Sequence, residues 1–374
     1  MTKTSAHRMP SRRSSLSFLL VATGFAATLA CGLADDDKKD DKAQDVDNTN
    51  TAALEPGGPG GSTPNGLAFP MGVQDWGVVG AATRADSGEL HVIVGNAKAV
   101  QAARSGQTNS WPDGSALAHL VWKAEQNPDD PTTIGPGDFG AVTLMMKDSA
   151  KYAADGGWAY GAWMGKDLTP PAAADFDRAC VNCHTQYVKD KDYVFTDPGQ
   201  LPTQAQVDAA ADAPNGVAFP EKILDWRVIG VARVSAANGP GTLRVIVGNP
   251  TAVTAARSGD TNPWPDGSMI SHYNWAASNN PETDAVLGAG VSVAPGAFNA
   301  FTLMQRSGAQ YAADGNWAYG VWPTTDLTPP AAADPQFDRA CVSCHTSSVP
   351  QRDMVFSHMA EFPPMMMPTA LGAR

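Results

Sequence analysis

The sequence predicts an α+β fold of mainly antiparallel β character, built from two tandem copies of one domain. Three observations predict it: one block of motifs occurs twice, each copy contains short β-rich apolar runs separated by Gly and Pro turns, and each copy ends in a helical segment carrying Cys-x-x-Cys-His. Hydrophobic residues make up 43% of the 374 residues, which suffices for packed cores. The net charge of −12 argues against a nucleic-acid partner, because phosphate binding needs clustered Lys and Arg.

The duplication covers most of the chain. The matched strings, in chain order, include 65–70 with 215–220, 94–96 with 247–249, 111–114 with 264–267, 158–161 with 317–320, and the identical 167–175 and 326–334. Each unit therefore has the size of a domain rather than of a solenoid repeat. We place the first domain at 65–198 and the second at 215–358, joined by a linker over 199–214 and followed by a loosely ordered tail over 359–374.

Within one unit, strands are expected over 76–83, 90–94, 115–122, 139–146 and 158–164. Asn96 can cap a short helix over 97–104, which Gly106 terminates, and the second copy adds Pro250 at the first helical position. An Ala-rich stretch after 170–171 is expected to be helical as far as His184. The connections between strands are short, which favours antiparallel pairing.

The N-terminus is typical of an export signal over 1–30. Three arginines precede an apolar run over 16–30, which has signal-peptide length and is short for a membrane span; they are Arg8, Arg12 and Arg13. Cys31 follows directly, as at a lipoprotein processing site, so we treat it as a lipidation candidate. Ordinary cleavage after Ala30 or Ala34 is the alternative. Both place the mature protein outside the cytoplasm, in the periplasm or at the outer face of a membrane.

The composition of residues 31–64 predicts a disordered tether. This segment opens with a run of Asp and Lys and ends in a Gly/Pro tract, and neither composition can bury a core. A tether next to Cys31 is what a lipid-anchored protein would need. Beyond residue 31, no stretch approaches the roughly 18 apolar residues of a membrane span.

The remaining four cysteines predict the cofactor. They form Cys180-Val-Asn-Cys183-His184 and Cys341-Val-Ser-Cys344-His345, and C-x-x-C-H is the attachment signal of c-type haem. Two thiols can add across the two vinyl groups of one haem, and the adjacent His can then bind the iron on the proximal side. The alternatives are a disulfide, a thioredoxin-like redox centre or a zinc site shared between the units. We expect two covalent haems, with His184 and His345 as proximal ligands.

The second axial ligand is open at this stage. Only His119 and His272 recur among the other histidines, each six residues after the Asp of Trp-Pro-Asp-Gly. On a strand, alternation places His119 on one face with Leu117 and Val121. Both are candidate distal ligands, and a satisfied core histidine is the alternative. Repeat-matched candidates that compete with them, or that pack on the haem, are Met145, Met304, Tyr160 and Tyr319.

The first unit contains, in this order, Phe-Pro, Asp-Trp, Val-Gly-Asn, Trp-Pro-Asp-Gly, Gly-Gly-Trp-Ala-Tyr and Cys-Val-Asn-Cys-His. This order of motifs resembles that of the cytochrome P460 family, which includes the β-fold cytochromes c′. The resemblance covers nearly all of 65–196 and 215–357. It implies an antiparallel β-rich fold that often dimerises, and activity toward hydroxylamine or nitric oxide. Duplication could also bring two haems together as in a family dimer.

The chain departs from the family's catalytic members at two positions. Their haem-linked Lys corresponds to His119 and His272, and their proton-transferring Glu to Thr143 and Thr302. These departures argue against hydroxylamine oxidation. They favour a diheme electron-transfer cytochrome with His on both sides of each iron and periplasmic or membrane redox proteins as partners. A haem protein that binds or oxidises nitric oxide or hydroxylamine is the alternative. The catalytic residues of such an enzyme are not identified by the sequence.

Overall fold

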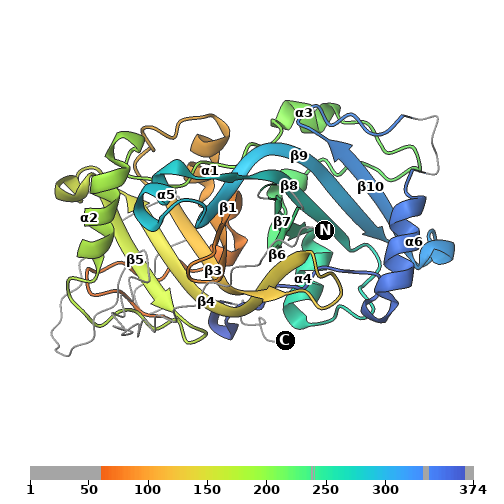
Figure 1. The fold of residues 1–374 in the computed structure, drawn as a ribbon, viewed down its shortest axis with the longest axis horizontal. Coiled ribbons are helices and arrows are strands. Elements are labelled where there is room, and N and C mark those ends of the chain that lie inside the picture. Colours follow the sequence, from red (N-terminus) through yellow and green to blue (C-terminus); the bar gives the residue numbers. More distant parts are fainter. Residues whose placement is uncertain (1–59, 237–238, 240, 332–336, 367–374) are drawn as a thin grey trace, which may run out of the picture.

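The computed structural model describes residues 60–236, 239, 241–331 and 337–366. The predicted signal peptide, Cys31 and nearly all of the predicted tether lie outside these residues. In the described part, most of the regular structure is antiparallel sheet with a few short helices (Figure 1), which confirms the predicted fold class. None of the helices described combines the length and apolar composition needed to cross a bilayer.

Each repeat contributes five strands in the same order. Those of the first are β1 (Gly77–Arg84), β2 (Glu89–Gly95), β3 (Ala116–Gln126), β4 (Thr133–Lys147) and β5 (Trp158–Met164). Those of the second are β6 (Arg227–Val234), β7 (Thr242–Gly248), β8 (Met269–Asn279), β9 (Ser292–Arg306) and β10 (Trp317–Pro323). Both long hairpins, β3–β4 and β8–β9, extend beyond the strands predicted from the sequence.

The two repeats share one sheet. The start of β4 pairs with the end of β6 through Thr133 and Val234, and the start of β9 pairs with the end of β1 through Ser292 and Arg84. Within the described residues, the pairings therefore run β1-β2-β3-β4-β6-β7-β8-β9 and return to β1, while β5 and β10 extend from β4 and β9. The units predicted as tandem domains are thus joined through both of their long hairpins.

The core has one shared layer and two outer layers. Inward-facing side chains of both repeats, such as Leu120, Trp122 and Tyr273, form one continuous cluster. The opposite face of each repeat forms a smaller cluster under its helices, with Leu117 and Ile93 in the first repeat and Ile270 and Ile246 in the second. Strand alternation therefore gives each repeat an inner face and an outer face.

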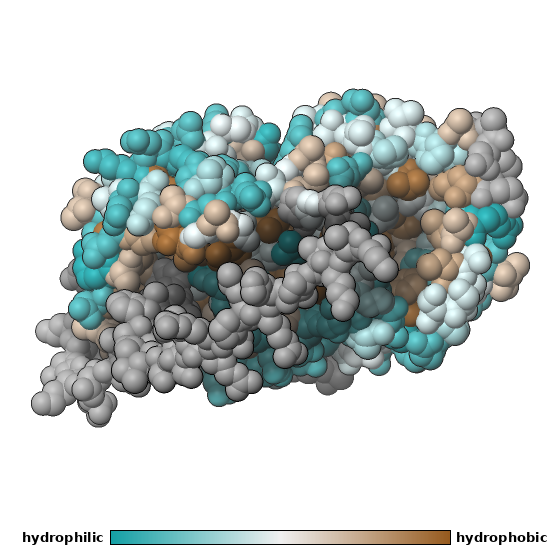
Figure 2. All heavy atoms as spheres, in the orientation of Figure 1, coloured by the Kyte–Doolittle hydropathy of each residue, from teal (hydrophilic) through white to brown (hydrophobic). Residues whose placement is uncertain are grey.

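Six α-helices lie around this sheet within the described residues. They are α1 (Ala97–Arg104), α2 (Asp177–Tyr187), α3 (Gln204–Ala209), α4 (Pro250–Ser258), α5 (Pro281–Leu287) and α6 (Arg339–Ser348). Helix α1 begins at the expected cap, since the side chain of Asn96 accepts from the backbone N–H of Ala99. The Ala-rich stretch at 172–174 is not helical, and α2 starts only after it. The surface over α2 and α5 is largely hydrophilic in the view shown (Figure 2).

The described part of the predicted tail is packed rather than loose. Ala360 and Phe362 are buried, the N–H of Ala360 donates to Ile229, and the indole of Trp122 donates to the carbonyl of Glu361 at 2.9 Å. The expectation of a loosely ordered 359–374 is therefore wrong for 359–366, while 367–374 lie outside the described residues. The tail was missed because its short apolar groups are separated by prolines and carry no strand or helix periodicity.

The linker provides the structural counterpart of this tail. The N–H of Gly199 donates to Val79, as that of Ala360 does to Ile229, and the indole of Trp275 donates to the carbonyl of Gln200 at 2.6 Å. Each repeat thus ends in a strap that crosses to the Trp of the other repeat's long hairpin. The linker then forms α3, which Thr203 and Gln206 begin with a capping box.

Truncating the aromatic side chain of the tail should destabilise both repeats together. Phe362 packs edge-on against Trp122 at 5.5 Å between ring centroids and is 8% exposed. We expect Phe362→Ala to lower the free energy of unfolding by about 3 kcal/mol, measured by urea denaturation. The control Glu361→Ala removes an exposed side chain and should cost less than about 0.5 kcal/mol. Equal stability of the two variants would contradict a packed tail.

Candidate haem sites

Both Cys-x-x-Cys-His motifs lie on helices, α2 and α6. Positions i, i+3 and i+4 of a helix lie on one face, so Cys180, Cys183 and His184 share a side of α2. Neither motif closes a disulfide within itself, because Cys183, Cys341 and Cys344 are free thiols. No group of three or more His, Cys, Asp or Glu side chains among the described residues could hold a metal ion, so a shared zinc site finds no support there.

The motif histidines are held by a matching hydrogen bond in each repeat. The Nδ1–H of His184 can donate to the carbonyl of Tyr193 at 2.7 Å, and that of His345 to the carbonyl of Met354 at 2.6 Å. A backbone carbonyl on Nδ1 fixes the tautomer and leaves Nε2 with its lone pair available for a metal. Each imidazole is therefore prepared as a metal ligand by the chain nine residues further on.

The accepting carbonyls are placed by a sharp turn after each helix. Asp192 and Tyr193 both have positive φ, at 50° and 63°, and Asp353 and Met354 repeat this at 47° and 65°. Two successive left-handed residues without glycine are strained and persist only where the surroundings hold them. The sequence analysis missed this turn, although Asp-x-Val-Phe recurs at 192–195 and 353–356 and could have indicated it.

In the first repeat a buried ion pair holds this turn. The carboxylate of Asp192 accepts from Lys147 Nζ at 2.5 Å and from the backbone N–H of Trp111 at 2.7 Å. The side chains of Lys147 and Asp192 are only 8% and 12% exposed. The Trp-Pro-Asp-Gly turn, the end of β4 and the turn after α2 are thereby joined at one carboxylate.

The second repeat builds the same junction with arginine. Asp353 accepts from Arg306 Nε at 2.9 Å and from the N–H of Trp264 at 2.8 Å, while Arg306 Nη1 also reaches Asp266 at 2.8 Å. Arg306 occupies the place of Lys147, because both end the fourth strand of their repeat. The recurrence of the junction with a different cation indicates that the charge pair itself is required.

Aromatic rings pack on both motif histidines. The ring centroid of His184 lies 4.8 Å from that of Tyr160 and 4.9 Å from that of Phe195. In the second repeat, His345 lies 4.7 Å from Tyr319 and 4.9 Å from Phe356. Tyr160 and Tyr319 therefore pack on the motif histidines, and their packing on a haem stays a prediction.

The candidate distal histidines lie on the outer faces of the sheet. His119 is opposite Ile93 on β2 and Thr143 on β4, and His272 is opposite Ile246 and Thr302. Each is thus on the same side as its own motif helix, and Thr143 and Thr302 stand directly beside them.

Desolvation keeps both partly buried distal candidates neutral. The pKa of His119 is lowered to about 3 by burial and by the nearby charges of His91 and His184, and that of His272 to about 3 by burial, Arg244 and His345. The pKa of His184 is lowered to about 4, also by burial. Neutral imidazole is the form that binds a metal.

The two sites differ at one neighbouring position. His119 Nδ1 lies 3.2 Å from His91 Nδ1, and His91 Nε2 lies 3.4 Å from a carboxylate oxygen of Glu89. In the second repeat Arg244 takes the place of His91, and its nearby carboxylate is that of Asp130 from the other repeat rather than one on its own strand. A small cavity of about 40 Å³ lies there, lined by His272, Arg244 and Phe356 among others. It has room for a few water-sized molecules.

Met145 and Met304 are also on the outer faces. Met145 is opposite Leu117 and Tyr160, and Met304 is opposite Ile270 and Tyr319. Both pack in the outer clusters, which is the ordinary environment of a core methionine. Each methionine lies two residues along its strand from the threonine that is opposite the candidate distal histidine.

The residues present fit a haem. Its iron would be held by His184 or His345, and its vinyl groups by the two cysteines of each motif. Buried donors near both motifs have no hydrogen-bond partner within the described residues; they are the hydroxyls of Tyr160 and Tyr319 and the indole N–H groups of Trp158 and Trp317. Leaving a buried donor without a hydrogen-bond partner costs free energy. The recurrence of these donors in both repeats is therefore consistent with a bound group whose polar atoms would accept from them.

Breaking the junction of the first repeat should destabilise the protein strongly. Lys147→Ala leaves Asp192 buried without its cation, and we expect a loss of about 3–5 kcal/mol in chemical denaturation. The double variant Lys147→Met/Asp192→Asn should recover much of this loss. As a control, Arg178→Ala breaks an exposed pair with Asp155 and should cost less than about 1 kcal/mol. A Lys147→Ala variant as stable as Arg178→Ala would show that the junction is not structural.

Comparison with known proteins agrees with this geometry. The family model Cytochrome P460 matches the chain twice, over residues 70–196 and 220–357. No curated protein matches the chain. The two matched regions include both motif helices, both candidate distal histidines and both long hairpins, and they cover well over half of the sequence. The chain is therefore a member of the cytochrome P460 family, a family of haem proteins, and carries its domain as a tandem duplication.

Proposed function

We propose that this protein is an exported cytochrome with two covalent c-type haems, one per repeat, and that it transfers single electrons. The observation that carries the proposal is the hydrogen bond from each motif histidine to a backbone carbonyl, made identically in both repeats at 2.7 and 2.6 Å. Membership of the family supports haem binding. The recurrence of the complete arrangement supports one haem at each motif.

The chain's own residues would supply the environment of each iron. His184 and His345 offer Nε2 on the proximal side, and their aromatic neighbours shield the imidazoles from water. His119 and His272, partly buried and neutral, are the candidates for the opposite side. A haem iron with two imidazole ligands supplies a one-electron couple and leaves no position for a substrate.

The residues beside the distal histidines support transfer rather than hydroxylamine chemistry. Threonine stands next to each distal histidine, at Thr143 and Thr302. A threonine hydroxyl neither ionises nor takes up a proton at neutral pH, so neither site has a base opposite the histidine on β4 or β9. Proton-coupled oxidation would need such a base.

Location and partners follow from the N-terminal prediction. Covalent haem attachment to Cys-x-x-Cys-His agrees with export to the periplasm or the outer face of a membrane. A lipid on Cys31, followed by the tether, would hold the protein near membrane redox proteins. The motif helices α2 and α6 lie at opposite ends of the long axis (Figure 1), which does not favour a closely spaced haem pair. Separate redox partners at the two ends are consistent with this arrangement.

One observation favours a second candidate function. The cavity of about 40 Å³ beside His272 and Arg244 could admit a diatomic or triatomic ligand. If the second iron has an open position, this repeat would bind or oxidise a small nitrogen oxide, as family members do.

The absorption spectrum separates the two functions. We expect the purified protein to show low-spin haem in both oxidation states, with no change on adding nitric oxide or hydroxylamine, because imidazoles occupy both axial positions. A high-spin spectrum, or catalytic turnover of hydroxylamine, would favour the second function instead. The comparison needs no variant and uses the full mature chain.

Removing each distal histidine tests the ligation directly. We expect His119→Ala and His272→Ala each to convert about one half of the absorbance to a high-spin form that binds nitric oxide. The controls Met145→Leu and Met304→Leu conserve volume on the same face and should leave the spectrum unchanged. If the histidine variants retain the low-spin spectrum and a methionine variant loses it, the methionines are the ligands.

A further inference from the structure

Each repeat sends an arm across to the other repeat's site. We define the first arm as residues 123–137 and the second arm as residues 276–296, the far ends of the two long hairpins with their connections. The first arm pairs with β6 through Thr133 and Ile134, and the second pairs with β1 through Ser292 and Val293. The tip of each arm lies beyond this pairing, next to the segment that follows the other repeat's motif helix.

An asparagine at the same position of each arm makes the same contact. The Nδ2 of Asn127 donates to the carbonyl of Phe356 at 3.1 Å, and the Nδ2 of Asn280 donates to the carbonyl of Phe195 at 3.2 Å. Both asparagines are 5% exposed. A buried amide with matched contacts in two repeats is a specific arrangement and not a solvated surface residue.

The same side chains also fix the conformation of their own arms. The Oδ1 of Asn127 accepts from the N–H of Asp129 at 2.9 Å, and the Oδ1 of Asn280 accepts from the N–H of Thr283 at 2.9 Å, where it caps α5. Each amide is therefore held by its own arm at the oxygen and reaches the other repeat with the nitrogen. The hydrogen bond within the arm therefore fixes the direction of the Nδ2 group that donates to the phenylalanine carbonyl.

The backbone carbonyl that each asparagine binds belongs to the phenylalanine that packs on the motif histidine. The Phe356 ring meets the His345 imidazole edge-on at 4.9 Å and 85°, and the Phe195 ring meets His184 at 4.9 Å and 80°. Phe356 follows two residues after Met354, whose carbonyl accepts from His345. One short segment thus provides both the acceptor and the packing surface of the proximal imidazole.

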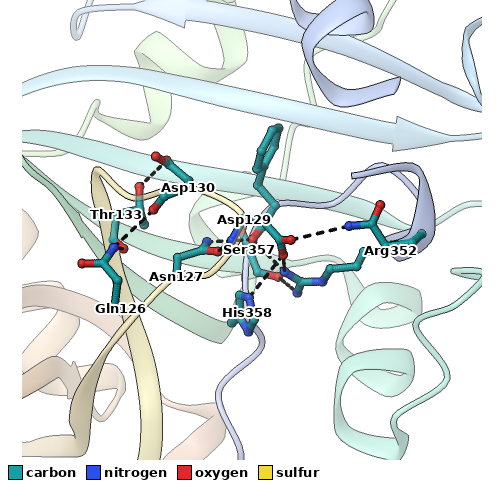
Figure 3. A network of polar contacts seen from close by, with 10 residues as sticks. Gln126, Asn127, Asp129, Asp130, Thr133, Arg352, Ser357 and His358 are labelled. Carbon is teal, nitrogen blue, oxygen red and sulfur yellow. Dashed lines mark hydrogen bonds and ion pairs between the residues drawn. The ribbon is translucent and has the colours of Figure 1, made fainter. Parts of the chain in front are cut away.

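Charged contacts fasten each arm at the same place. In the second site, Asp129 pairs with Arg352 at 2.8 Å, and Arg352 donates to the carbonyls of Phe356 and Ser357, a network that Figure 3 shows. At the other site, Glu282 of α5 pairs with Lys191 at 3.2 Å. The cavity beside His272 confirms that the first arm reaches this site, since Asn127, Asp130 and Thr133 line it.

We infer that the two arms position the proximal histidines in trans: Asn127 of the first repeat orients His345 of the second, and Asn280 of the second orients His184 of the first. This rests on the proposed function, because the orientation matters through the iron that each histidine would bind. Each haem would then take its covalent bonds and its proximal ligand from one repeat and the placement of that ligand from the other.

The consequence is a crossed pattern of effects. The angle of an axial imidazole about the iron–nitrogen bond affects the g values of ferric low-spin haem in electron paramagnetic resonance. Loss of the Asn127 amide from the first arm should alter the signal of the haem at Cys341 and Cys344 and leave the haem at Cys180 and Cys183 unchanged. Loss of the Asn280 amide from the second arm should do the reverse. A general loss of stability would not produce this crossed pattern.

The test uses two backgrounds that retain one haem each. Cys180→Ala/Cys183→Ala keeps only the second haem, and Cys341→Ala/Cys344→Ala keeps only the first. In each background, Asn127→Ala and Asn280→Ala are compared by electron paramagnetic resonance of the ferric protein. We expect Asn127→Ala to shift or broaden the largest g value of the second haem only, and Asn280→Ala that of the first haem only.

Two further variants keep the test decisive if the alanine variants fold poorly. Asn127→Asp conserves the size and the Oδ1 acceptor but removes the donor to Phe356, so it should shift the second haem's signal as alanine does. Gln126→Ala is the matched control, because within the described part of the chain this side chain bonds only to Asp130 and Thr133 of its own arm. It should leave both signals unchanged.

The outcomes distinguish this inference from the function beneath it. A protein that carries no covalent haem after maturation overturns the proposed function and the inference with it. A haem-loaded protein in which the arm variants alter neither signal, or alter the haem of their own repeat, overturns the inference alone. The crossed shift, with Gln126→Ala silent, supports it.

Discussion

The arrangement of both sites depends on one hydrogen bond, from Nδ1 of the motif histidine to a backbone carbonyl nine residues later. It determines which nitrogen faces a metal, and it requires a strained turn to bring the carbonyl within reach. That turn is held by the buried carboxylate of Asp192 or Asp353, which also binds the Trp-Pro-Asp-Gly turn. Sequence motifs that are far apart in the chain therefore act together to position one imidazole in each repeat.

The duplication has produced a molecule in which neither repeat is complete. The inner faces share one core, the straps at the ends of the repeats cross to the opposite hairpin, and the arms reach the segment that follows the opposite motif helix. Each exchange occurs in both directions. A pair of separate domains would need none of them, so the observed contacts make the two sites interdependent.

Much of this could be predicted from the sequence, because it resides in local patterns. The motif cysteines, the recurrence of His119 and His272, and the strand alternation that puts them on the helix side are all visible in short segments. The arms were not predicted, since charged and glycine-rich ends such as Lys123 and Gly135 lack the apolar alternation of a strand and are ordered by pairing with the other repeat. The strap at Phe362 was missed because it also lacks strand or helix periodicity, and the Lys147–Asp192 pair because its two residues are distant in sequence.

The central claim is that both motifs hold a covalent haem. Mass spectrometry of the mature protein, followed by proteolysis and analysis of the two Cys-x-x-Cys-His peptides, tests it most directly. The account predicts that the intact mass includes two haem groups and that the peptides containing Cys180 and Cys341 each carry one. Haem on only one of the two peptides, or on neither, would contradict it.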